Sequence, residues 1–268
     1  PIVGAVVVDS AGKIVGEGFH KSGPHAEVVA LEQAGQLAKG ATLFVTLEPC
    51  SHHGKTGPCT EAIIKAGIAK VVYAVRDPNL LASGGAKALE AAGIEVDFNS
   101  EVTEIAHSNR AWLHKIRNNR PYFIWKIATT LDGRTAAIDG SSKWITGPES
   151  RAEVSQLRSE SSAILIGTAT ALADNPNLIP RDLEITRKTN PVRIVMGLRE
   201  VPSDFNLNND AAETIFLRSH DFSELLKLCA ERDFNQVFVE SGSELGTALL
   251  KAGLIDELII FQAASLLG

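Results

Sequence analysis

The chain has little of what disulfide-rich, membrane and nucleic-acid-binding proteins need. Its 268 residues include only three cysteines, an odd number that is too small for a disulfide framework. No apolar run reaches the roughly 20 residues that a membrane-spanning helix requires. The formal net charge is -6, which argues against a nucleic-acid-binding surface spread over the whole protein. We therefore expect a cytoplasmic protein that binds neither membranes nor nucleic acid.

The rest of the composition is that of an ordinary globular protein. Hydrophobic residues make up 44% and charged residues 22% of the chain. The length suits one large domain or two domains of common size. The chain starts at Pro1, inside a predicted strand, and stops at Gly268, so we expect both ends to be truncated.

Apolar runs and helical patterns alternate along the whole chain. The first half predicts a β-hairpin over residues 2–19, followed by alternating helices and strands. A single helix is expected over 101–117, just before an Asn-Asn-Arg-Pro sequence that suits a domain boundary. The second half repeats the strand–helix alternation. We therefore predict the α/β class, with one domain over 1–119 and a second over 120–268.

The strongest chemical pattern is a His-x-Glu motif formed by His25 and Glu27, followed by Cys50 and Cys59. Zinc favours imidazole and thiolate ligands, and a catalytic zinc site keeps one tetrahedral position open for water. One histidine and two cysteines leave that position open. We therefore predict one zinc ion per chain, bound by His25, Cys50 and Cys59. Because Cys59 opens a predicted helix, we expect its thiol to ionise readily.

Glu27 distinguishes a catalytic zinc site from a structural one. A His-x-Glu motif followed by Pro-Cys and a second cysteine is the signature of zinc-dependent deaminases, in which the glutamate moves protons and does not bind the metal. The eight residues between Cys50 and Cys59 exceed the two of the common form. They include His52 and His53, which compete for the role of fourth ligand. A purely structural zinc module is therefore the alternative.

Several longer motifs make the chain similar to a known family. The sequences are Gly-Pro-His-Ala-Glu at 23–27, Cys-Ser-His-His-Gly-Lys-Thr at 50–56 and Trp-Ile-Thr-Gly at 144–147. Over essentially its whole length the chain resembles the bifunctional riboflavin-biosynthesis deaminase/reductases. The resemblance implies a cytidine-deaminase-like α/β/α domain, then a dihydrofolate-reductase-like α/β domain. It also implies a homodimer.

The same resemblance implies two successive reactions on phosphoribosylaminopyrimidines. The first is hydrolytic deamination of 2,5-diamino-6-(5-phosphoribosylamino)pyrimidin-4-one, and the second is NADPH-dependent reduction of the ribosyl group to ribityl. Implied substrate contacts in the second domain are Ser142, Arg158, Leu178, Arg181 and Glu240. Implied cofactor contacts are Ala128, Trp144, Thr170, Asp174, Gly242, Ser243, Glu244, Leu245, Gly246, Thr247 and Ala248.

Two of the implied substrate contacts carry a specific expectation. Arg158 and Arg181 can each hold a phosphate through paired hydrogen bonds, so we expect them to bind the ribose phosphate. One functional alternative stays open. It is a single-activity zinc deaminase of another base or nucleotide, with a degenerate second domain.

Overall fold

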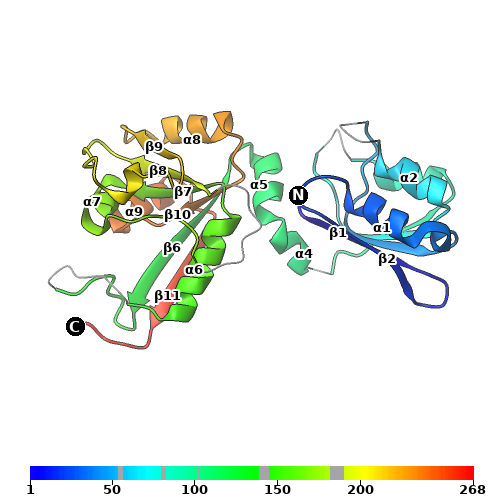
Figure 1. Ribbon diagram of the computed structural model, residues 1–268, viewed down its shortest axis with the longest axis horizontal. Coiled ribbons are helices and arrows are strands. Elements are labelled where there is room, and N and C mark those ends of the chain that lie inside the picture. The colour runs from blue at the N-terminus through cyan, green and yellow to red at the C-terminus, as the bar shows by residue number, and fades with distance from the viewer. Residues whose placement is uncertain (54–56, 80–82, 102, 139–144, 182–189) are drawn as a thin grey trace. The chain divides into compact units, whose positions relative to one another are not determined.

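The computed structural model describes residues 1–53, 57–79, 83–101, 103–138, 145–181 and 190–268. Its contacts separate two units, Pro1–Asn118 and Asn119–Gly268, which we call the N-terminal and C-terminal domains (Figure 1). This division lies one residue before the boundary expected from the sequence. Among the helices of these ranges, none has the length and apolar character needed to cross a membrane.

The N-terminal domain is built on a five-stranded mixed sheet. The strand order is β2-β1-β3-β4-β5, with β1 antiparallel to both neighbours and β3, β4 and β5 parallel. Its strands are β1 (Val3–Val8), β2 (Ile14–His20), β3 (Thr42–Leu47), β4 (Lys70–Val75) and β5 (Glu95–Phe98). The predicted hairpin is thus confirmed as β1 and β2.

Helices pack on this sheet because its apolar residues alternate along each strand. In β1, for example, Val3, Ala5 and Val7 are buried in the core, as the period-two pattern requires. The helices of this layer are α1 (Ala26–Ala34, continued by the 3-10 helix η1, Gly35–Ala38), α2 (Cys59–Ala66) and α3 (Gly85–Ala91).

The single helix expected over residues 101–117 is wrong. The structure has two helices, α4 (Thr103–Ser108) and α5 (Arg110–Asn118), with Asn109 between them. The side chain of Asn109 accepts a hydrogen bond from the Ile2 backbone nitrogen and donates one to the Ile2 carbonyl, both at 2.8 Å. These long-range bonds fix Asn109 in the break between the helices.

Two glycines of β2 allow helix α1 to lie directly against the sheet. A Cβ atom on Gly16 would come within 2.1 Å of the Ala30 carbonyl oxygen, and one on Gly18 within 1.9 Å of the Ala26 carbonyl oxygen. Both distances are far below van der Waals contact. This close approach sets the position of the amino end of α1, where His25 and Glu27 lie.

The C-terminal domain has a six-stranded, fully parallel sheet in the order β11-β6-β10-β7-β8-β9. Its strands are β6 (Tyr122–Thr130), β7 (Ala163–Gly167), β8 (Val192–Met196), β9 (Thr214–Leu217), β10 (Gln236–Val239) and β11 (Glu257–Ala263). The connecting helices are α6 (Pro148–Glu160), α7 (Thr168–Asp174), η2 (Asn206–Asn208), α8 (Phe222–Glu231) and α9 (Ser243–Lys251).

Helices cover both faces of this second sheet (Figure 1). Val237 and Val239 of β10 face one core with residues of α8 and α9, while Phe238 faces the other with residues of α6 and α7. A parallel strand buried on both faces is apolar without interruption, which explains the continuous apolar runs of the sequence. The predicted α/β class is confirmed.

We predict that Gly18→Ala destabilises the N-terminal domain by about 1–3 kcal/mol, because the new methyl group overlaps the backbone of α1. Urea unfolding followed by circular dichroism measures the change. Gly4→Ala is the matched control in β1, since a Cβ atom there meets only the Thr46 methyl group at 3.7 Å. Equal stability of the two variants would contradict this account of the packing.

Candidate functional site

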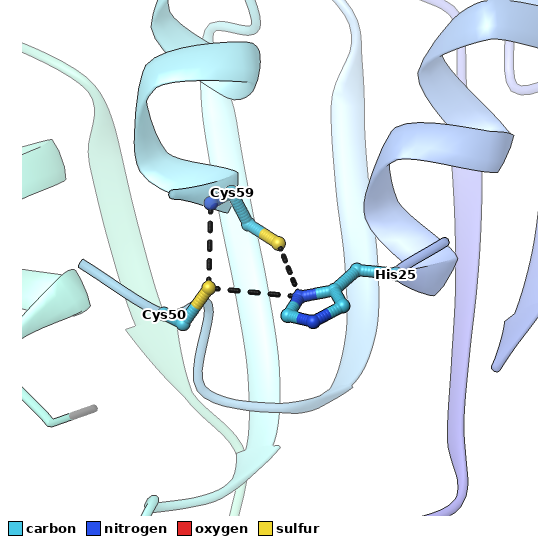
Figure 2. Close-up of side chains that lie close together, drawn as sticks. All are labelled: His25, Cys50 and Cys59. Carbon is cyan, nitrogen blue, oxygen red and sulfur yellow. Dashed lines mark hydrogen bonds between the residues drawn. The ribbon is translucent and has the colours of Figure 1, made fainter. Parts of the chain in front are cut away.

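The three predicted metal ligands meet in the N-terminal domain. His25 immediately precedes α1, Cys50 lies just beyond the end of β3, and Cys59 is the first residue of α2. Their ligand atoms lie within 4.8 Å of one another. The His25 Nδ1 atom is 3.1 Å from the Cys59 sulfur and 3.6 Å from the Cys50 sulfur (Figure 2). This donor set is the one that zinc prefers.

Backbone hydrogen bonds hold the two cysteines together. The Cys59 amide donates to the Cys50 sulfur at 3.4 Å, and the Thr60 amide donates to the Cys50 carbonyl at 3.2 Å. Cys50 therefore sits at the amino end of α2, where unpaired helix amides favour a negative charge. The eight-residue insert between the cysteines leaves this contact intact, although its residues 54–56 lie outside the described ranges.

The two thiols differ in their ionisation. Hydrogen bonding from Cys59, with a further contribution from His25, lowers the pKa of Cys50 to about 5. The pKa of Cys59 is raised, because its thiol is the donor in that hydrogen bond and because it is buried. The expectation that Cys59 ionises readily is therefore wrong for the metal-free chain. Of the two thiols in the metal-free chain, Cys50 therefore has the lower pKa.

Glu27 lies in the first turn of α1 and is only 4% exposed. Burial raises the pKa of its carboxyl group above the ordinary value. Glu27, His25 and Cys50 line one cavity of about 210 Å³. A carboxyl group with a raised pKa accepts a proton more readily than an ordinary glutamate, which suits a general acid and base.

Several other residues of this cavity were not predicted from the sequence, namely His20, Glu48, Asp77, Asn79 and Trp112. His52, which the sequence indicated as a competitor for the fourth ligand position, also lines the cavity. Glu48 is a positioning residue: its carboxylate accepts hydrogen bonds from the backbone amides of Asp77, Gly84 and Ala86 at 3.2–3.3 Å. The sequence position of Glu48 and Asp77 could have indicated that they lie at the site. Both follow neighbouring parallel strands, whose carboxyl ends share one edge of the sheet.

A larger cavity of about 770 Å³ lies on the opposite face of the same sheet. It is lined by apolar residues such as Val6, Phe44 and Val72, and by Ile105 of α4. None of the three metal-ligand candidates contributes to its lining. Size therefore does not identify the chemical site, and the smaller cavity holds the reactive groups.

In the C-terminal domain, a group of largely buried charged residues lies on β6, on α6 and just beyond the carboxyl end of β10. Glu240 accepts hydrogen bonds from Nε and Nη2 of Arg158 at 2.6 and 2.9 Å, and Lys126 lies 3.4 Å away. Burial by itself would raise the pKa of Glu240, but the two cations outweigh it and hold the pKa below its usual value. The three residues line a cavity of about 490 Å³ with Ala128 and Arg181.

This pairing alters the expectation for Arg158. Its guanidinium group donates hydrogen bonds to the Glu240 carboxylate and, from Nη1, to the Ile179 carbonyl oxygen at 3.1 Å. Its paired donors are therefore not directed at a phosphate. A buried carboxylate requires such a partner. Arg181 lines the same cavity and is not bound to Glu240. Leu178 is buried in the core, with a positive φ of 52°, and does not line the cavity.

A second cavity of this domain, of about 710 Å³, lies where α7 and α9 begin. It is lined by six of the expected cofactor contacts, namely Thr170, Gly242, Ser243, Glu244, Leu245 and Ala248. Thr170 accepts a hydrogen bond from the Gly242 amide at 3.3 Å. Asp174, Gly246 and Thr247 do not line this cavity. Ser142 and Trp144 lie outside the residues that the structure describes.

Comparisons with known proteins agree with the two sites. Residues 1–75 match the cytidine and deoxycytidylate deaminase zinc-binding region, and residues 121–268 match the RibD C-terminal domain. The chain therefore combines a zinc-binding deaminase domain with a reductase domain. This confirms the predicted cytidine-deaminase-like and dihydrofolate-reductase-like folds.

Individual relatives define the family. The riboflavin biosynthesis proteins RibD of Mycobacterium tuberculosis and Aquifex aeolicus are 45% and 43% identical over all of this chain, which spans 80% and 82% of theirs. A Thermotoga maritima deaminase/reductase structure is 37% identical with a TM-score of 0.89, over 99% of this chain and 81% of that one. The chain belongs to the RibD family of bifunctional riboflavin-biosynthesis enzymes.

We predict that the zinc-free protein carries one thiolate, on Cys50. With a pKa of about 5, the thiolate is present above that pH and is lost as the pH falls through it. Ultraviolet absorbance of the thiolate against pH measures this change. Cys50→Ser should remove the signal, whereas Cys229→Ala should keep it, because burial raises the pKa of Cys229 to about 12. Absorbance that appears only near the usual pKa of a free thiol would refute the assignment.

Proposed function

We propose that the N-terminal domain binds one zinc ion through His25, Cys50 and Cys59 and hydrolyses an amino group from a pyrimidine. The observation that carries this proposal is the buried Glu27 beside three ligands that leave a tetrahedral position open. When bound, zinc polarises a water molecule so that it is a nucleophile at neutral pH. A structural zinc site does not require a proton-transferring glutamate beside the ligands.

The residues of the chain then handle the protons of the reaction. Glu27 takes a proton from the attacking water and transfers it to the ring nitrogen, and it later protonates the departing amino group. Water is consumed and ammonia is released, so the amino-bearing carbon becomes a carbonyl carbon. His52, Asp77 and Asn79 supply polar groups around the ring.

We propose 2,5-diamino-6-(5-phosphoribosylamino)pyrimidin-4-one as the substrate of this step. The Thermotoga maritima relative is described as a diaminohydroxyphosphoribosylaminopyrimidine deaminase and 5-amino-6-(5-phosphoribosylamino)uracil reductase. Family membership over the full chain supports the same pair of compounds here. We further propose a cytoplasmic homodimer that binds no nucleic acid, in keeping with the family and the net charge of -6.

We propose that the C-terminal domain reduces the ribosyl group of the deaminated product with NADPH. The sugar ring would open at the carbon that carries the amino nitrogen, so that the ring oxygen becomes a hydroxyl and the carbon forms an imine with that nitrogen. Bound NADPH would supply a hydride to the imine carbon, a proton would add to the imine nitrogen, and NADPH would be oxidised to NADP⁺. Lys126 and Glu240 border the cavity in which the sugar would lie, and Arg181 is the cation suited to its phosphate. The cavity at the start of α9 suits the cofactor phosphates.

Glu27→Gln should reduce ammonia release by about 100- to 10,000-fold, because the variant cannot transfer protons. Zinc content, measured by elemental analysis, should stay at one ion per chain. Glu32→Gln is the matched control, since Glu32 lies on the same helix and is exposed. Ammonia release at the normal rate from Glu27→Gln would refute the mechanism.

Arg181→Gln should raise the KM for the phosphorylated, deaminated substrate by about 10- to 100-fold, with kcat less affected, because a charged hydrogen bond to phosphate is lost. NADPH oxidation measures both constants. The corresponding nucleoside without phosphate is the control, and the variant should treat it as the unmodified protein does. If the substitution raises the KM for the nucleoside and for the phosphorylated substrate by the same factor, Arg181 does not bind the phosphate.

A further inference from the structure

An arginine and a histidine line the cofactor cavity of the C-terminal domain without having a role in the proposed reaction. Arg199 follows β8 and His220 follows β9, and both are exposed in the cavity of about 710 Å³. Neither has a hydrogen-bond or ion-pair partner among the described residues. The adjacent Glu200 is paired instead with Arg218, at 3.2 Å.

The strand order relates this cavity to the cavity of about 490 Å³ in the same domain. Lys126, Ala128 and Glu240, at the reacting end, belong to β6 and the end of β10, whereas Arg199 and His220 belong to the far edge beyond β8 and β9. Four strand spacings of about 4.8 Å separate β6 from β9, or about 19 Å. An extended dinucleotide with its nicotinamide near Ala128 therefore brings its adenosine to Arg199 and His220.

The middle of this path suits the pyrophosphate. The Gly242 amide and the first turn of α9 lie there, next to the hydroxyl of Thr170. The cavity lining contains one acidic group, the exposed Glu244 at the start of α9. Arg199 and His220, neither of which has a partner among the described residues, are at the adenosine end, where NADPH and NADH differ by a single phosphate.

We propose that Arg199 and His220 bind the 2′-phosphate of NADPH and select it over NADH. Arg199 supplies a planar set of donors that fits a phosphate, and His220 adds a second donor from the neighbouring strand end. This inference rests on the proposed NADPH-dependent reduction and identifies the residues that determine its cofactor specificity.

Calorimetric binding to the 268-residue chain tests the proposal without any turnover. The probes are NADPH, NADH, adenosine 2′,5′-bisphosphate and adenosine 5′-phosphate. Arg199→Gln should weaken the binding of the two 2′-phosphorylated probes by about 10- to 100-fold and leave the binding of NADH and adenosine 5′-phosphate nearly unchanged. His220→Gln should act in the same direction, and Arg199→Lys should recover part of the loss because it restores the charge.

Arg232→Gln is the matched control. Arg232 follows α8, pairs with Glu213 at 2.6 Å, and lies outside the cavity lining. Unchanged preference for NADPH in Arg199→Gln, or equal weakening of NADPH and NADH, would overturn the inference while leaving the reductase proposal in place. Failure of the unmodified protein to bind either dinucleotide would remove both.

Discussion

The close approach of His25, Cys50 and Cys59 is the set of contacts on which the metal site of the N-terminal domain depends. A thiolate removed from water is unfavourable unless donors or cations stand beside it. The Cys59 amide, the Cys59 thiol and the His25 ring meet this need in the metal-free chain. The His25 ring and the Cys59 thiol, together with the Cys50 sulfur, form the ligand set for a divalent cation. The metal site is therefore assembled before the metal arrives.

The C-terminal domain also stabilises a buried negative charge, and it does so with charged side chains. Glu240 is buried at a strand end, and Arg158 and Lys126 compensate its charge. Breaking such a buried pair leaves an uncompensated charge and is costly, so the arrangement is rigid. Both domains therefore keep their reactive groups in fixed places at the carboxyl edge of a sheet, next to the start of a helix.

The sequence predicted the residues whose chemistry depends on type and order, such as His25, Glu27 and the two cysteines. It did not predict properties created by contacts between distant segments. The break at Asn109 depends on Ile2, and the order in which the thiols ionise depends on which sulfur receives the Cys59 amide. The pairing of Arg158 with Glu240 likewise joins residues far apart in the chain, so no local sequence pattern predicts it.

The central claim is that zinc chemistry in one domain precedes cofactor chemistry in the other. The most direct measurement supplies the diaminopyrimidine phosphate and follows ammonia and NADPH separately, before and after zinc is removed with a chelator. The account predicts that ammonia release leads NADPH oxidation, that chelation stops both, and that the deaminated compound restores NADPH oxidation to the chelated protein. NADPH oxidation by chelated protein given the diamino compound would contradict the account.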